Sequence, residues 1–124
     1  MSDVIQGRCL CGATRFEARA APAFAIRCYC ADCQKVSGGG SAPQVGFAVS
    51  DVTVSGKITR FPGKADSGSQ LTFGFCGDCG SPISKSTSAA ADRVFIYAGA
   101  FDDPSAVPPL RPVFDASRPI WDKD

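Results

Sequence analysis

The chain has 124 residues and a formal net charge of +1, and it contains seven cysteines but no histidine. This length fits one domain, which we assign to residues 1–124. The near-neutral charge and the lack of a basic run argue against a nucleic-acid partner. No apolar run approaches the roughly 18 residues needed to cross a membrane, so we expect no membrane partner.

The start of the chain shows no basic region followed by an apolar stretch, so we expect no signal peptide and a cytoplasmic protein. Thiols stay reduced in the cytoplasm, and closely spaced cysteines there indicate metal sites before disulfides. Because the cysteine count is odd, a pure disulfide framework would leave one thiol free. Seven thiolates and two Zn²⁺ ions would bring the formal charge to about −2.

The glycine and proline content, 13 and 9 residues, favours many turns and short strands. Residues 31–37 have room for about two helical turns, which the glycines at 38–40 would end. Residues 62–69 are predicted to be a polar loop. Alternating apolar residues predict a mainly β fold with strands at 13–19, 23–29, 41–49, 51–56, 57–61, 70–76, 81–86 and 93–101. The proline-rich residues 102–124 are expected to be extended, with Phe114, Ile120 and Trp121 as anchors.

Three short motifs contain all seven cysteines: Cys9 with Cys11, then Cys28, Cys30 and Cys33, then Cys76 with Cys79. A C-x₂-C knuckle offers two sulfur ligands from one turn, and the glycines of CGDCG suit such a turn. The alternative for Cys76 and Cys79 is a redox dithiol, which would need a βαβ context that the pattern lacks.

Seven sulfurs divide most simply into four plus three. Two pairs would make a closed tetrahedral site, and the triple would leave a fourth position open for water or substrate. A second division, which joins Cys76 and Cys79 to two cysteines of the triple, would split three closely spaced ligands. The triple itself has two other interpretations: a structural zinc site completed by Asp32, or a set of buried reduced thiols.

The motifs GRCLCG (7–12), CYCADCQKVSG (28–38) and FCGDCGSPI (75–83) together resemble the glutathione-dependent formaldehyde-activating enzyme family, also called the centromere-protein-V domain family. The resemblance runs through nearly the whole chain. The chain departs from the family at Tyr29, where many members have histidine, and in the run Leu71–Phe75, where many have a basic residue.

The resemblance implies a β-tent fold of twisted antiparallel sheets that is stabilised by zinc. It implies two Zn²⁺ ions per chain: a structural ion on Cys9, Cys11, Cys76 and Cys79, and a catalytic ion on Cys28, Cys30 and Cys33. The implied activity is that of a carbon–sulfur lyase, which forms S-hydroxymethylglutathione from glutathione and formaldehyde.

The residues suit this chemistry, because a thiol that enters an open zinc position loses its proton and can attack an aldehyde carbon. Tyr29, Lys35 and the backbone N–H groups after Cys33 are candidates to bind the resulting oxyanion. Arg15, Arg27 and Lys35 are candidates to bind substrate carboxylates, although exposed cations are more often only solvated.

The sequence is also compatible with two other functions. The first is a non-catalytic, zinc-stabilised module that binds a protein partner through an apolar surface near residues 101–107. The second is a redox or metal sensor that uses the triple as labile thiols.

Overall fold

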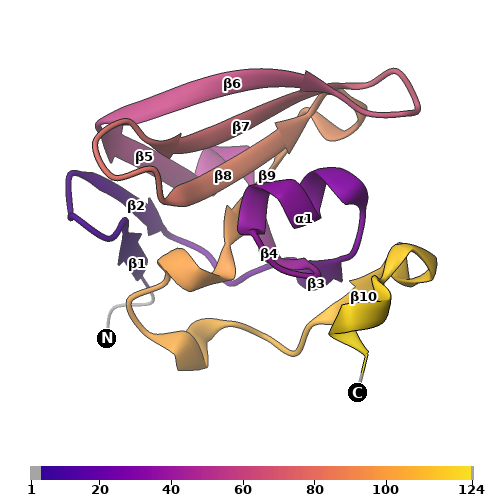
Figure 1. Ribbon diagram of the computed structural model, residues 1–124. Helices are drawn as coiled ribbons and strands as arrows, with labels where there is room; N and C mark the ends of the chain where they lie inside the picture. The colour runs from indigo at the N-terminus through magenta and orange to yellow at the C-terminus, as the bar shows by residue number, and fades with distance from the viewer. Residues whose placement is uncertain (1–3, 124) are drawn as a thin grey trace.

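The computed structural model describes residues 4–123, in which ten strands form two sheets and one α-helix, α1 (Ala31–Ser37), precedes β4 (Figure 1). The smaller sheet has the order β1-β2-β5 and consists of β1 (Ile5–Arg8), β2 (Thr14–Ala18) and β5 (Val52–Gly56). The larger sheet has the order β10-β3-β4-β9-β8-β7-β6 and consists of β3 (Phe24–Cys28), β4 (Ala42–Ala48), β6 (Ile58–Lys64), β7 (Gln70–Cys76), β8 (Pro82–Thr87), β9 (Arg93–Tyr97) and β10 (Arg111–Val113).

Neighbouring strands run antiparallel in both sheets, with the exception of β10, which pairs in parallel with β3. The prediction of a mainly β fold built from antiparallel sheets with short helical turns is therefore confirmed. In Figure 1, α1 lies between β6–β8 on one side and β3 and β4 on the other. None of the helices in residues 4–123 is long and apolar enough to cross a membrane.

Phenylalanine rings from both sheets and from the chain after β9 meet in the core. The Phe16 and Phe101 ring centroids are 5.2 Å apart, and those of Phe47 and Phe101 are 6.3 Å apart. Ile83 and Ile96 are fully buried in the same cluster, which also contains two of the cysteines, Cys9 and Cys76. Since Phe101 belongs to this core, it is not part of an exposed apolar surface.

Two predictions about the chain outside the core were wrong. Strand β6 continues through Pro62 to Lys64 instead of ending in a polar loop. A proline is tolerated there because β6 is the edge strand of its sheet and leaves one side of its backbone unpaired. In the C-terminal segment, the expected anchors Phe114, Ile120 and Trp121 are 67%, 84% and 66% exposed.

Gly56 offers a test of how tightly β2 and β5 pack. Its φ is +96°, and a Cβ atom there would overlap the backbone carbonyl of Ala13. We expect Gly56→Ala to lower the free energy of unfolding by about 2–4 kcal/mol, through backbone strain and steric overlap together. Denaturant unfolding measures this loss.

Gly68 provides the matched control, because its φ is +95° but nothing lies within 4 Å of a Cβ atom added there. We expect Gly68→Ala to cost only the strain, about 1 kcal/mol. Equal losses at the two positions would contradict the close approach of β5 to Ala13.

Candidate metal centres

A first group of cysteines lies where the β1–β2 turn meets the β7–β8 turn. The Sγ atoms of Cys9, Cys11, Cys76 and Cys79 all lie within 4.8 Å of one another, and we call them the four-sulfur cluster. The Cys9–Cys11 and Cys11–Cys76 Sγ···Sγ distances are 3.6 and 3.8 Å. A tetrahedron with Zn–S bonds of about 2.3 Å has an S···S edge of about 3.8 Å, so the cluster fits a tetrahedral metal ion.

The two turns that carry this cluster end in the same way. Gly12 follows Cys11 and Gly80 follows Cys79, with φ angles of +83° and +81°. Each glycine N–H donates back to the carbonyl of the first cysteine of its pair: Gly12 to Cys9 at 3.2 Å, and Gly80 to Cys76 at 2.8 Å. A side chain at either glycine would strain this left-handed backbone. The glycine after each cysteine pair thus lets both sulfurs of the pair face the same point.

Hydrogen bonds orient the sulfurs and join the two turns. The backbone N–H of Thr14 donates to Cys9 Sγ at 3.2 Å, and the backbone N–H of Leu10 donates to Ser81 Oγ at 3.0 Å. Ser81 Oγ also lies 3.2 Å from Cys79 Sγ. Hydrogen bonds from the Ser81 side chain and backbone lower the pKa of Cys79 to about 5. A sulfur that loses its proton this readily is a good metal ligand.

The second group of cysteines lies at the junction of β3 and α1. Cys28 ends β3, Cys30 is the N-cap of α1, and Cys33 lies in the first helical turn. Their Sγ atoms lie within 4.8 Å of one another, and we call them the three-sulfur cluster. Cys28 and Cys33 are buried, whereas Cys30 is half-buried. Among residues 4–123, no carboxylate belongs to either cysteine cluster, so Asp32 does not complete this one.

The three thiols share their protons unequally before any metal binds. Hydrogen bonds from Cys28 and Cys33 lower the pKa of Cys30 to about 2. The same sharing raises the pKa of Cys33, through Cys28 first and Cys30 second. Three thiolates this close together, two of them buried, would repel one another without a cation. The donor set therefore fits a thiophilic metal ion that all three sulfurs can bind.

Two side chains from neighbouring strands contact the sulfur of Cys33. Gln44 on β4 is buried, and its Nε2 donates to Cys33 Sγ at 3.2 Å. Lys85 on β8 places its Nζ 3.7 Å from the same sulfur and 5.8 Å from the centroid of the Phe73 ring. Neither residue is predictable from the sequence, because nothing local to positions 44 or 85 indicates that their strands pass beside α1.

Tyr97 at the end of β9 is a further residue that the sequence analysis missed. It is only 6% exposed and packs in one cluster with Cys28, Cys33 and Ala42. Its phenol oxygen is buried and has no hydrogen-bond partner among the described residues. Burial, and then the charge of Cys33, raises the pKa of Tyr97. The phenol is therefore a neutral, unpaired donor beside the three-sulfur cluster.

The structure separates the predicted substrate-binding residues. Tyr29 is buried, and the guanidinium of Arg118 lies 5.5 Å from the centroid of its ring. Lys35 instead lies on α1 and lines a cavity. Arg15 donates to the carbonyl of Gly12, and neither Arg15 nor Arg27 lines the cavities described below.

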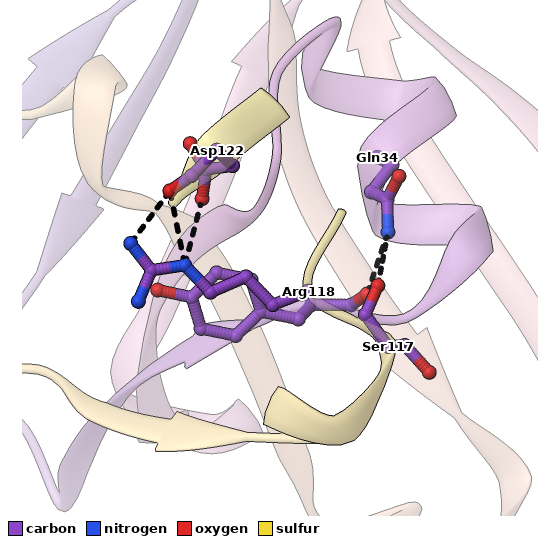
Figure 2. Close-up of polar contacts among 5 residues, drawn as sticks. Gln34, Ser117, Arg118 and Asp122 are labelled. Carbon is purple, nitrogen blue, oxygen red and sulfur yellow. Dashed lines mark hydrogen bonds and ion pairs between the residues drawn. The ribbon is translucent and has the colours of Figure 1, made fainter. Parts of the chain in front are cut away.

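The C-terminal segment holds the loop that carries the three-sulfur cluster. Gln34 on α1 donates from Nε2 to the carbonyl of Ser117 at 3.1 Å, and Arg118 donates to the carbonyl of Asp122 at 2.6 Å (Figure 2). The Tyr29 backbone N–H donates to Val113 in β10 at 3.0 Å. Polar contacts and the packing of Val113 against the three-sulfur cluster thus attach this segment to α1 and β3, whereas the anchors expected from the sequence are exposed.

Two cavities flank Tyr97, which lines both of them together with Pro82. The first has a volume of about 550 Å³ and lies between the four-sulfur cluster and the start of β4; its polar lining includes Arg8, Ser37, Ser81 and Asp102. The second has a volume of about 480 Å³ and lies between α1 and the β6–β7 hairpin; its lining includes Asp32, Lys35, Val36, Phe61, Lys64, Phe73 and Phe75.

Comparisons with known proteins agree with this arrangement. A family model described as glutathione-dependent formaldehyde-activating enzyme matches residues 4–117. A crystal structure of a Rhodobacter sphaeroides protein has the same fold, with a TM-score of 0.68 and 19% sequence identity; the alignment covers 87% of this chain and 99% of that one. Among curated proteins, no match was found.

The unpaired phenol of Tyr97 gives a prediction about stability. A buried polar group without a partner costs about 1–3 kcal/mol, so we expect Tyr97→Phe to raise the free energy of unfolding by about 1 kcal/mol in the absence of substrate. Denaturant unfolding of the metal-loaded protein measures the change.

Thr14→Val is the matched control, because Thr14 Oγ1 is the other buried side-chain oxygen without a partner in the described residues. Both substitutions should be neutral or stabilising. A loss of stability at Tyr97 alone would mean that its phenol makes a hydrogen bond within the protein.

Proposed function

The chain belongs to the glutathione-dependent formaldehyde-activating enzyme family, and on that premise we propose that it joins a thiol to a small aldehyde at the three-sulfur cluster. The observation that carries the proposal is the division of seven cysteines into one cluster of four sulfurs and one of three. Four sulfurs complete a tetrahedral site, whereas three leave a position that a substrate sulfur can take.

We propose that each cluster holds one Zn²⁺ ion. Cys9, Cys11, Cys76 and Cys79 would hold a structural ion, and Cys28, Cys30 and Cys33 a catalytic one. Bound zinc would supply a positive charge that lowers the pKa of a thiol beside it. None of the seven cysteines is in a disulfide, so each sulfur is available as a metal ligand.

The reaction adds a thiol across a carbonyl group, so no oxidant or reductant is needed. The sulfur–carbon bond forms, the carbonyl double bond becomes single, and the thiol proton ends on the carbonyl oxygen. Negative charge develops on that oxygen while the bond forms. Lys85 would stabilise this charge, since its ammonium lies 3.7 Å from Cys33 Sγ. Gln44 would keep the Cys33 sulfur in place through its 3.2 Å hydrogen bond.

The predicted substrate contacts keep different roles in this proposal. Lys35 lines the cavity beside α1 and is available to an anionic group of a thiol substrate. The ring of Tyr29 packs against Arg118, so its hydroxyl is a less direct candidate than Lys85 for the carbonyl oxygen. The alternative function, a protein-binding module, gains no support from residues 101–107, because Phe101 is buried in the core.

Metal content tests the division of the cysteines. We expect two zinc ions per wild-type chain and one in Cys30→Ser, with the fold retained, because that substitution removes a ligand from the three-sulfur cluster only. Cys76→Ser should prevent folding, because structural zinc contributes on the order of 10 kcal/mol to small domains. Elemental analysis and thermal unfolding give these results. If Cys30→Ser unfolds, the three-sulfur cluster has a structural role instead of the proposed catalytic one.

Thiol binding tests the proposed chemistry directly. In the cobalt-substituted protein, we expect added thiol to change the visible absorption of the ion in the three-sulfur cluster, because a fourth sulfur ligand would join it. Cys30→Ser, which should keep only the ion in the four-sulfur cluster, serves as the control and should not respond. A wild-type spectrum that no thiol changes would rule out the proposed reaction.

A further inference from the structure

The cavity between α1 and the β6–β7 hairpin, which we call the aromatic cavity, is lined in part by phenylalanines, whereas a peptide thiol would need polar partners. Its volume is about 480 Å³, and three phenylalanines line it: Phe61, Phe73 and Phe75. Phe61 is 60% exposed, so its ring stands at the open side of the cavity. Small-molecule sites are commonly lined by aromatic residues with a few polar groups, and this cavity has that composition.

The aromatic cavity lies next to the three-sulfur cluster. Lys35 and Val36, which line it, follow Cys33 on α1, and Tyr97 packs against both the cavity and the cluster. Lys85 connects the two places, because its ammonium lies 3.7 Å from Cys33 Sγ and 5.8 Å from the Phe73 ring centroid. No cysteine of the cluster lines the cavity itself, but Tyr97 and Lys85 lie between the two, so a thiol whose sulfur reached the cluster would have its body beside the phenylalanines.

The charged groups of the aromatic cavity favour a single anion. Lys35 and Lys64 line it with Asp32, which leaves a net charge of one positive unit. Lys64 belongs to edge strand β6, and Lys35 faces the cavity from α1. One carboxylate or similar anion at the cavity opening would be balanced by these lysines, and the phenylalanines would contact the rest of the ligand.

The lining does not match either of the two reactants in the family's name. Glutathione has two carboxylates, an ammonium and two peptide groups, and polar groups against phenylalanine rings lose their hydrogen bonds to water without replacement. Formaldehyde is a single carbon, which would leave the cavity unfilled. We infer that the thiol substrate has an aromatic or branched apolar body with one anionic group, and that it binds in the aromatic cavity with its sulfur at the three-sulfur cluster.

This inference rests on the proposed function, and binding measurements separate the two. The probes are 4-(mercaptomethyl)benzoate, phenylmethanethiol and glutathione, each titrated calorimetrically into the zinc-loaded full-length protein under reducing conditions. We expect 4-(mercaptomethyl)benzoate to bind at least about tenfold more tightly than glutathione, because its ring is buried on binding. Loss of its carboxylate, in phenylmethanethiol, should weaken binding about threefold at low salt.

Two pairs of variants assign the effect to the aromatic cavity. Phe61→Ser should weaken binding of 4-(mercaptomethyl)benzoate about tenfold, whereas Phe114→Ser, at a phenylalanine of similar exposure outside both cavities, should leave it unchanged. Lys64→Gln should remove the difference between the two aromatic thiols. Lys123→Gln, on the exposed C-terminal segment, should preserve that difference.

The outcomes are distinct. If no probe binds wild-type protein, the proposed function fails. If glutathione binds as tightly as 4-(mercaptomethyl)benzoate, or if Phe61→Ser and Phe114→Ser behave alike, this inference is wrong while the proposed function stands. Preference for the aromatic anionic thiol that is lost in Phe61→Ser and kept in Phe114→Ser supports the inference.

Discussion

The meeting of four sulfurs between two turns is the contact on which the rest of the structure depends. Cys9 and Cys11 belong to the β1–β2 turn of the small sheet, and Cys76 and Cys79 to the β7–β8 turn of the large one. A domain of this size has a modest core, so a metal ion held by these sulfurs would link its two sheets and contribute a large share of its stability. Cys9 and Cys76 are also buried in that core, which joins the apolar packing to the sulfur ligands.

The three-sulfur cluster differs from the four-sulfur cluster in how its ligands are brought together, although in both the Sγ atoms lie within 4.8 Å of one another. Its cysteines come from one continuous segment, the end of β3 and the start of α1, and that segment is held by the parallel pairing of β3 with β10 and by polar contacts with the C-terminal segment. The side chains that contact its sulfur come from β4 and β8, which are fixed in the large sheet. The cluster is thus a locally formed set of ligands supported by a paired sheet, which would suit the proposed role of a site that exchanges substrates.

Tyr97 lies between the three-sulfur cluster and the two cavities. Its side chain lies beside the three-sulfur cluster, and it lines both the cavity near the four-sulfur cluster and the aromatic cavity beside α1. The proposed reaction needs two reactants near one point, and the two cavities share Pro82 and Tyr97 in their lining. The buried Tyr97 hydroxyl has no hydrogen-bond partner in the described part of the chain, which lowers the stability of the fold. A group retained at such a cost is a candidate for a functional role.

The sequence by itself determined the features that depend on short spacing. The helix at 31–37, the left-handed glycine that ends it, the strand from 70 to 76 and the three short cysteine motifs all follow from local patterns, because turns and ligand pairs are set within a few residues. The meeting of the first and last motifs, 65 residues apart, depends on the tertiary structure. Tertiary structure alone decided that Gln44 and Lys85 contact Cys33, from positions 11 and 52 residues away in sequence. Alternation tells which residues of a strand share a face, but not which strand lies beside it. The aromatic cavity and the exposure of Phe114, Ile120 and Trp121 have the same origin, since both depend on which surfaces the fold brings together.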